Sequence, residues 1–453
     1  MKPYASYKPA QTPWINEIPA DWNLDRIGMH FFERKTKVSD KDFPPLSVTK
    51  KGILPQLSTV AKTKDTDNRK LVMVNDFVIN SRSDRRGSSG VSPSDGSVSL
   101  INIVLTPYDV VPKWSHYLFR SHAFIEEYYR NGRGIVADLW TTRYSEMRGI
   151  FIPIPSREEQ DHIVRFLDWK VAEVNHFIRQ KRREIALLTE LMNTRIKEAV
   201  FRGLKLSGTK QDSGIHWVGK IPAHWETKVL FEVATEQSNS NKTVHNQNLL
   251  SLSYGKIVNK DINTTEGLLP ASYDTYQVVD DGNIILRLTD LQNDKRSLRV
   301  GIATQTGIIT SAYTCLKARD NDMLPHYIYL LLHSYDICKV FYSMGGGVRQ
   351  SIGYGEIKRM SLPIPPTDEQ QKIVDYCYAL RADIDKMIAE VKREITFITE
   401  YRTRMISDVV TGKVDVRGIV VPDFAVEEVV EDADDEEETD EIADEEVEDN
   451  ADD

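Results

Sequence analysis

Two arginine-rich loops contain the side chains whose types and spacing could recognise a polyanion. Residues 80–90 follow the apolar run 77–79, and residues 287–301 follow the apolar run 284–286. Each loop has an arginine three residues after an isoleucine, then a basic pair, then a glycine. Arginine forks suit phosphates and guanine edges, while Asn, Gln and Ser side chains pair with base edges or the backbone. The pattern predicts two contact loops, with ordinary solvated loops as the alternative.

A shorter, glycine-containing polar segment follows each arginine-rich loop later in the chain. The first comprises residues 131–134 together with position 143, and the second comprises residues 345–350. Glycine lets a backbone approach DNA closely, although such segments are equally common as plain loops. The two kinds of segment give the predicted DNA-binding residues: Arg82, Arg85, Arg86, Ser88, Arg133, Arg143, Arg287, Gln292, Asn293, Lys295, Arg296, Arg299, Arg349 and Gln350.

The chain lacks the motifs of common catalytic sites. It has no phosphate-binding loop, dinucleotide-binding glycine pattern, zinc spacing or serine-nucleophile elbow. Glu356 and Lys358 have nuclease-like spacing, but no suitable upstream Pro-Asp pair accompanies them. Cys315, Cys338 and Cys377 are far apart, as expected for buried thiols in a reducing compartment. We therefore predict a non-catalytic binding protein without a metal site.

Two long helices are predicted to position the loops. Segments 156–203 and 366–412 follow a Pro-Ile-Pro run, continue with Glu-Gln and Ile-Val, and end at a glycine. In the first segment, apolar residues spaced alternately by three and four form a coiled-coil seam: Val171, Val174, Ile178, Ile185, Leu188, Met192 and Ala199. Lys181 and Arg195 interrupt this seam, and the second segment has its own arginines at complementary positions. The helices are predicted to pair with each other, with two separate surface helices as the alternative.

The whole chain has the pattern of a tandem duplication. The sequence Trp-x-x-x-Ile-Pro-Ala-x-Trp occurs at residues 14–22 and again at residues 217–225. Short apolar runs predict strands, and residues 117–129 and 326–342 predict helices, so that each repeat is a mixed α/β domain. The predicted domains are residues 1–155, a central helix 156–204, a linker 205–216, residues 217–365, a C-terminal helix 366–412, and a tail 413–453 that is acidic and disordered from residue 427.

The net charge of −10 arises from the C-terminal end alone. Residues 427–453 contain 18 of the 68 acidic residues and none of the 58 basic ones, so residues 1–426 carry a charge of +8. A mildly basic body with a polyanionic tail is typical of nucleic-acid-binding proteins, although many ordinary domains also carry +8. The sequence contains neither an apolar run of membrane-spanning length nor a signal peptide, which predicts a cytoplasmic protein without a membrane partner.

These features resemble the specificity (S) subunits of bacterial type I restriction-modification systems. The resemblance covers residues 1–418 and rests on the repeated Pro-x-Pro…Glu-Gln opening, on residues 212–225 and on residues 410–417. It implies two target recognition domains, separated by two long antiparallel coiled-coil helices, that each read one half of an asymmetric bipartite site in double-stranded DNA. It also implies methyltransferase (M) and restriction (R) subunits as partners. These would carry S-adenosylmethionine, ATP and Mg, so no cofactor is expected on this chain.

Two other interpretations fit the same sequence. A coiled-coil adaptor with two α/β protein-binding modules and no DNA role would show the same duplication. A silent recombination cassette, whose product is rarely made, would also have this sequence.

Overall fold

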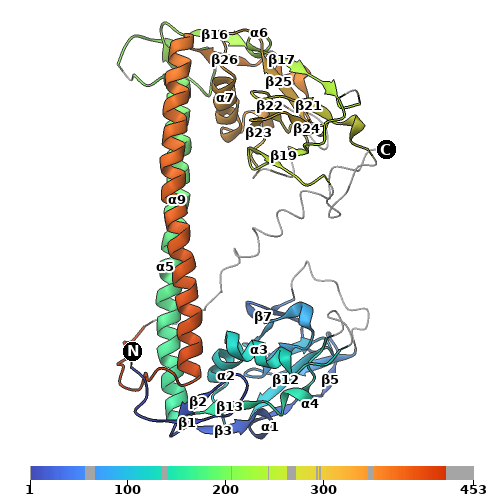
Figure 1. The fold of residues 1–453 in the computed structure, drawn as a ribbon, viewed down its shortest axis with the longest axis vertical. Helices are drawn as coiled ribbons and strands as arrows, with labels where there is room; N and C mark the ends of the chain where they lie inside the picture. Colours follow the sequence, from blue (N-terminus) through green and yellow to red (C-terminus); the bar gives the residue numbers. More distant parts are fainter. Residues whose placement is uncertain are drawn as a thin grey trace. The chain divides into compact units, whose positions relative to one another are not determined.

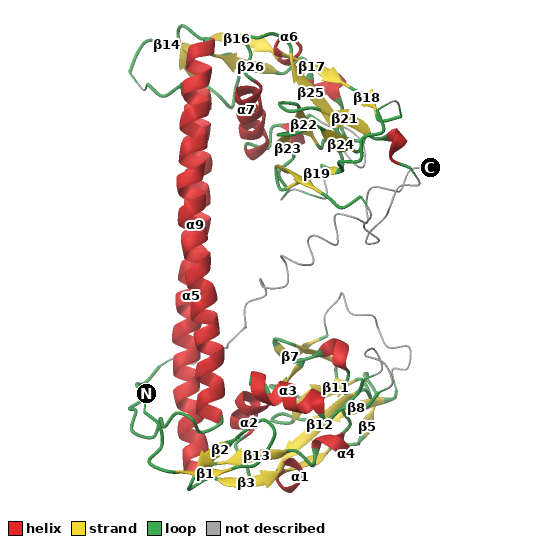
Figure 2. Ribbon diagram, viewed as in Figure 1, coloured by secondary structure: helices red, strands yellow, loops and turns green. Residues whose placement is uncertain are grey.

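The computed structural model describes residues 2–56, 67–134, 140–205, 207–242, 244–262, 272–291, 294, 297–344 and 351–424. The chain divides into two compact units, unit 1 (Met1–Lys181 and Lys392–Glu436) and unit 2 (Arg182–Val391 and Glu437–Asp453). Each unit contains antiparallel sheets, short helices and one segment of each of two long helices (Figure 1; Figure 2). The predicted mixed α/β fold with long helices is therefore confirmed.

Unit 1 is built around a four-stranded antiparallel sheet with the strand order β10-β9-β12-β4. A three-stranded sheet, β11-β8-β5, and the pairs β1-β2, β3-β13 and β6-β7 complete its β structure among the described residues. The strands are β1 (Tyr7–Pro9), β2 (Glu17–Pro19), β3 (Asn23–Arg26), β4 (Phe31–Glu33), β5 (Lys37–Val38), β6 (Leu46–Thr49), β7 (Gly52–Pro55), β8 (Arg69–Val72), β9 (Phe77–Asn80), β10 (Ser89–Val91), β11 (Gly96–Val98), β12 (Asn102–Pro107) and β13 (Phe151–Ile154).

The α-helices of unit 1 share one hydrophobic cluster with the four-stranded sheet, while β6, β7, β8 and β11 form a second cluster with other residues of β9 and β12. The helices are α1 (Ile27–His30), α2 (Pro112–Phe119), α3 (His122–Arg130), α4 (Tyr144–Met147) and the 3-10 helix η1 (Ser83–Arg85). The single helix predicted over residues 117–129 is wrong, because the chain breaks between α2 and α3. Ser121 adopts an extended conformation there, and its hydroxyl accepts the hydrogen bond of the Phe124 amide as an N-cap.

Unit 2 repeats this arrangement of strands. Its main sheet has the order β23-β22-β25-β17, and its second sheet has the order β24-β21-β18. Each of the pairs β14-β15, β16-β26 and β19-β20 also has a counterpart in unit 1. The strands are β14 (Lys210–Asp212), β15 (Lys220–Pro222), β16 (Glu226–Val229), β17 (Ala234–Gln237), β18 (Asn239–Ser240), β19 (Leu250–Ser253), β20 (Lys256–Asn259), β21 (Gln277–Val279), β22 (Ile284–Leu286), β23 (Val300–Ile302), β24 (Gly307–Ile309), β25 (Thr314–Ala318) and β26 (Ser361–Ile364).

The principal short helix of unit 2 ends earlier than the sequence predicts. Its helical elements are α6 (Leu230–Val233), η3 (Tyr273–Thr275), α7 (Pro325–Ile337), η4 (Phe341–Ser343) and α8 (Tyr354–Ile357). The predicted helix 326–342 corresponds to α7 followed by η4, because Lys339 takes a left-handed conformation with φ of 59° between them.

The two long helices are α5 (Arg157–Arg202) and α9 (Thr367–Val410), and they run antiparallel within each unit (Figure 1). In unit 1, Arg402 donates to Asn175 at 2.5 Å and Lys181 pairs with Glu394 at 2.8 Å. Higher residue numbers on α5 therefore pair with lower residue numbers on α9, as expected for antiparallel helices. Two of the polar residues that interrupt the apolar seam, Lys181 and Arg402, are thus matched across it as predicted. Arg195 instead pairs with Glu198 of its own helix, and Arg381 donates to Tyr329 of α7.

Both long helices begin at the same kind of anchor. The buried Gln160 side chain accepts from the Val111 amide at 2.8 Å and donates to Pro155, and this joins the start of α5 to that of α2. Gln370 does the same at the start of α9, accepting from the Leu324 amide at 3.0 Å and donating to Pro365. The repeated Glu-Gln motif therefore has a structural role in fixing each long helix to its unit.

Both long helices also end in the same way, at a glycine packed on a tryptophan. Gly203 and Gly412 have φ of 72° and 80°, and each lies against a buried tryptophan, Trp225 in unit 2 and Trp22 in unit 1. A Cβ at Gly412 would lie 2.4 Å from Pro19, so glycine is needed there both for space and for backbone conformation.

The segments predicted as linker and tail contain more structure than expected. The linker 205–216 includes β14, which pairs with β15. The first part of the predicted tail packs on unit 1, since Val416 is fully buried and its carbonyl oxygen lies 2.8 Å from His162 Nε2. Short apolar stretches such as residues 414–421 do not reveal this packing. The acidic residues 427–453 lie outside the described residues.

Candidate nucleic-acid interface

In unit 1, the loop between β9 and β10 exposes three of the predicted arginines. Arg82, Arg85 and Arg86 all face solvent, whereas Ser88 is only 5% exposed and lies beneath them. Arg82 forms an ion pair with Asp84 at 3.6 Å. The loop therefore presents basic side chains, while Ser88 supports its backbone and does not reach the surface.

The second polar segment of unit 1 lies directly against this loop. Thr141 bridges to the backbones of both Arg82 and Arg133, and the Thr142 amide donates to the Ser81 carbonyl at 2.9 Å. Arg133 and Arg143 are exposed beside the loop. These contacts bring together Arg82, Arg85, Arg86, Arg133 and Arg143, which we call the basic surface of unit 1.

A tyrosine at the end of α3 holds this loop in place. The Tyr129 hydroxyl lies 3.4 Å from the Asn80 carbonyl oxygen and 3.3 Å from that of Arg85. Burial raises the pKa of Tyr129 to about 12, so the hydroxyl stays protonated and donates at neutral pH. The Arg86 guanidinium lies 5.4 Å from the centre of the Tyr129 ring and pairs with Glu126. Arg86 therefore shares its fork with the protein, whereas Arg85 points to solvent.

Unit 2 has the same loop frame after β22. The Ile352 amide donates to the Leu288 carbonyl at 2.9 Å, as the Thr142 amide does to Ser81 in unit 1. The Tyr342 hydroxyl donates to the Asp294 carbonyl at 3.3 Å, which parallels the contacts of Tyr129. The predicted residues Gln292, Asn293, Lys295, Arg296, Arg349 and Gln350 lie outside the described residues.

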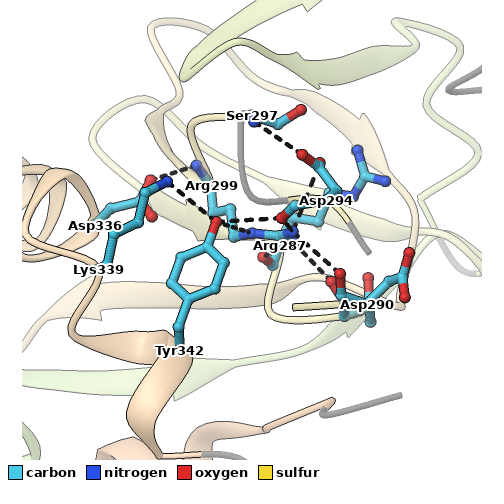
Figure 3. Close-up of polar contacts among 9 residues, drawn as sticks. Arg287, Asp290, Asp294, Ser297, Arg299, Asp336, Lys339 and Tyr342 are labelled. Atoms are coloured by element: carbon cyan, nitrogen blue, oxygen red, sulfur yellow. Dashed lines mark hydrogen bonds and ion pairs between the residues drawn. The ribbon is translucent and has the colours of Figure 1, made fainter. Parts of the chain in front are cut away.

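The prediction that Arg299 contacts DNA is wrong for this structure, because its side chain is fully buried. All five of its N–H groups find acceptors inside the protein, and Figure 3 shows the residues that surround it. The acceptors are Tyr342 Oη at 3.0 Å and the carbonyl oxygens of Arg287 at 3.4 Å, Thr289 at 2.6 Å, Asp290 at 3.2 Å and Asp294. Arg287 is also largely buried, with 9% exposure, and contributes through its backbone.

A buried carboxylate supports this arrangement from α7. Asp336 is fully buried and its Oδ2 accepts from the Arg299 amide at 2.5 Å. Burial raises the pKa of Asp336 to about 6, although the Arg299 amide, Lys339 and the Arg299 guanidinium favour the charged form, and Asp294 opposes it. The sequence offered no signal for Asp336, Tyr342, Tyr129 or Glu126, because each acts through a contact distant in the chain.

The raised pKa of Asp336 predicts a pH-dependent stability. The folded protein binds this proton more tightly than the unfolded chain, so stability is full at about pH 4 and falls as the pH rises towards 6. We therefore expect the effect of Asp336→Asn on the free energy of local unfolding to depend on pH. The effect at pH 7 should be more stabilising than the effect at pH 4 by about 2 kcal/mol. Native-state hydrogen exchange of the α7 amides across pH 4–7 measures this. A difference between variant and wild type that is constant with pH would contradict it.

No other kind of functional site is evident in the described part of the chain. Within these residues, no cluster of His, Cys, Asp and Glu side chains is arranged to hold a metal ion. The helices found there lack the combination of length and apolarity needed to cross a membrane. Cys315 and Cys377 are buried, and all three cysteines are free thiols. That the chain binds no cofactor remains a prediction.

Comparison with known proteins identifies the family that this chain resembles. Residues 222–396 match the model of the type I restriction modification DNA specificity domain. A putative type I restriction enzyme MjaX specificity subunit from Methanocaldococcus jannaschii is 23% identical over 284 residues, which are 60% of this chain and 61% of that protein. The match thus spans about three fifths of the curated relative's length.

One solved structure with a TM-score above 0.5 shares the fold. A chain from a structural study of complex assembly and conformational transition in the type I R-M system has a TM-score of 0.62 at 13% identity, covering 88% of this chain and 99% of that chain. The HsdS subunit from Thermoanaerobacter tengcongensis has a TM-score of 0.44 at 17% identity, covering 87% and 96%. Together, the matches confirm the resemblance to type I specificity subunits that the sequence predicts.

Proposed function

We propose that this chain, which carries a type I restriction modification DNA specificity domain at residues 222–396, is the DNA-recognition subunit of a type I complex. Each α/β unit would bind one half of an asymmetric bipartite site in double-stranded DNA. Catalysis would lie on partner methyltransferase and restriction subunits, which would carry S-adenosylmethionine, ATP and Mg.

The observation that carries this proposal is the loop frame that occurs in both units. In each unit a loop leaves the same strand of the four-stranded sheet, and a tyrosine hydroxyl and a backbone hydrogen bond hold it. The loops differ in length and sequence, with residues 81–88 in unit 1 and 287–299 in unit 2. A common scaffold with different loops suits two readers of different half-sites, because base-edge contacts depend on the individual side chains.

Single-molecule methylome sequencing tests the proposal directly. The host strain should carry adenine methylation at one asymmetric sequence with two defined parts and an unread gap, and this methylation should vanish when the gene is deleted. Restoring the gene should restore the same sequence. Methylation that does not depend on this gene would contradict the proposal and favour an adaptor without a DNA role.

The basic surface of unit 1 yields a more specific prediction. Replacing Arg85 and Arg86 by alanine should weaken the assembled enzyme on its site through one half-site alone. A lost base contact costs ~1–3 kcal/mol and relaxes the base at one position, whereas a lost phosphate contact lowers the salt-dependence slope by about one for all sequences. Binding titrations at several salt concentrations separate these outcomes.

A matched control for this experiment is Arg26→Ala, which removes an exposed arginine of the same unit from β3. It should change neither the recognised bases nor the salt slope. If the loop variant altered both half-sites, the assignment of one unit to one half-site would be wrong.

The long helices offer matching surfaces for the proposed partners. In unit 1, Phe177, Phe397 and Tyr401 are 39–62% exposed, and we call them apolar cluster 1. In unit 2, Leu187, Leu191 and Met387 are 44–55% exposed and form apolar cluster 2. Cluster 1 positions 177, 397 and 401 correspond to cluster 2 positions 387, 187 and 191 through the same 210-residue offset that relates the two helices.

Helix geometry places the members of each cluster on one side of the helix pair. Phe177 directly precedes Ile178, a residue of the apolar seam that is only 3% exposed. Tyr401 directly precedes Arg402, which bonds Asn175 across the helix pair. In an antiparallel pair of right-handed helices, residues one position before the contact turn towards the same side. Tyr401 and Phe397 are four residues apart and share a face. Exposed apolar groups repeated in this way suit the docking of one methyltransferase subunit on each cluster.

A further inference from the structure

Arg299 lies in a buried cluster of polar groups in unit 2 that includes Asp336. An arginine at the start of β23 lies inside its own loop, with the loop's carbonyl groups turned inward around it (Figure 3). A buried arginine left unpaired is costly, and so are buried carbonyl groups without donors. In the observed conformation of the loop backbone, the buried carbonyl groups accept from the buried guanidinium, so that neither is left without a partner.

We propose that Arg299 is a positioning residue that fixes the loop backbone after β22 at the described residues 287–291 and 294, and that it thereby determines the specificity of unit 2 for its half-site. The inference rests on the proposed function and deepens it. In unit 2, the shape of the contact loop would depend on a buried residue. In unit 1, the corresponding loop is held by fewer internal contacts.

The geometry of the guanidinium explains why this residue suits the role. The planar fork of Arg299 bonds carbonyl groups spread over residues 287–294 at once, so it ties the two ends of the loop together. Lysine has three donors on one atom and cannot reach these spread acceptors. Asp290 has a φ of 52°, a left-handed conformation that a non-glycine residue keeps only when its surroundings hold it.

Two further elements hold Arg299 itself, one through its backbone and one through its guanidinium. From α7, Asp336 accepts from the Arg299 backbone amide, so the start of β23 is fixed to the helix. From η4, the Tyr342 ring lies 5.4 Å from the guanidinium carbon, and its hydroxyl accepts from Nε at 3.0 Å while donating to Asp294. Arg299 thereby joins the loop to both α7 and η4.

Unit 1 differs in a way that supports this assignment. Its loop is shorter, Tyr129 alone bonds two of its carbonyl groups, and Arg86 over the Tyr129 ring remains half-exposed. Both loops therefore combine an arginine with a tyrosine ring, but only the longer loop buries the arginine. Removing Arg299 should affect the half-site of unit 2 and leave that of unit 1 unchanged.

The test uses the full-length chain, with Arg299→Lys as the main variant and Tyr342→Phe as a milder one that removes only a hydroxyl. Arg319→Lys, an exposed arginine directly after β25 in the same unit, is the matched control. Hydrogen exchange of the described amides between residues 288 and 299 reports loop order without requiring DNA. Methylome sequencing of strains carrying each variant reports the recognised sequence.

We expect exchange in the loop to rise about tenfold or more in Arg299→Lys, and less in Tyr342→Phe, with the β25 amides unchanged. The methylated sequence should lose definition in one half only, while the other half and the gap stay as in the wild type. Unchanged loop exchange in both variants would overturn the positioning role. Faster exchange with an unaltered methylated sequence would overturn the role in specificity.

These outcomes are distinguishable from failure of the proposed function. If the wild-type gene directs no bipartite methylation, the proposed function fails, together with the specificity role that rests on it. The exchange measurement still decides whether Arg299 orders the loop. If Arg299→Lys does not fold, the exchange and methylation patterns of Tyr342→Phe decide both roles in the same way.

Discussion

Lengthening both long helices by four residues is expected to widen the unread gap of the proposed bipartite DNA site by one or two base pairs, with both half-sites unchanged. The insertion points are between Ile185 and Leu188 in α5 and between residues 388 and 391 in α9. These points face each other, because Lys181 pairs with Glu394 and Asn175 bonds Arg402. Inserting at both points keeps the two helices in register.

The expected size is set by helix and DNA geometry. Four residues add about 6 Å along a helix and rotate the remainder of that helix by about 40° beyond a full turn. Six ångströms is roughly one to two base pairs, over which DNA turns by roughly 34–72°. The rotation of the helix pair therefore matches that of the DNA. A seven-residue insertion would preserve the apolar seam better, but it would rotate the remainder of the helix by about −20°. The corresponding three base pairs of DNA turn by roughly 100°, so the two rotations would not match.

Methylome sequencing of a strain carrying the paired insertion measures the gap. An insertion in α5 alone serves as the control, since it shifts one helix against the other and should reduce activity without giving a new defined gap. Full activity with the original gap in the paired variant would mean that the helices do not set the spacing. An altered half-site would mean that the units do not read DNA independently of the helices.

The sequence predicted the long helices well because their signals are local and repeated. The Pro-Ile-Pro openings, the Glu-Gln pairs and the closing glycines lie next to the elements that they delimit, and the seam is a short-range periodicity. The ends of α2, α3 and α7 were missed because they depend on the backbone conformation of single residues, the extended Ser121 and the left-handed Lys339.

The candidate site was predicted less completely, for a physical reason. An arginine in a polar loop has the same sequence pattern whether it faces solvent, as Arg85 does, or is buried, as Arg299 is. The difference depends on Tyr342 and Asp336, which lie 43 and 37 residues away in the chain. Likewise, the hydrogen bond between Thr142 and Ser81 brings together two polar segments that lie about 60 residues apart in the chain.

Removing the apolar clusters on the long helices is expected to remove methyltransferase subunits one at a time. Phe397→Ser with Tyr401→Ser abolishes most of cluster 1, and Leu187→Ser with Leu191→Ser abolishes most of cluster 2. Truncating a buried anchor at a protein interface costs about 2 kcal/mol or more, so two such changes should weaken one docking site by several hundredfold or more. All four side chains are exposed in this chain, so the changes remove little packing from its own core.

Native mass spectrometry of this chain co-produced with the proposed methyltransferase partners counts the docked copies. Each double variant should bind one copy fewer than the wild type, and the fourfold variant should bind none. Glu400→Ser is the control, because Glu400 is an exposed polar neighbour of Tyr401 on the same helix and should leave the count unchanged. If the fourfold variant kept the full count, the clusters would not be the docking surface. If either double variant lost every copy, the two clusters would not be independent docking sites for one subunit each.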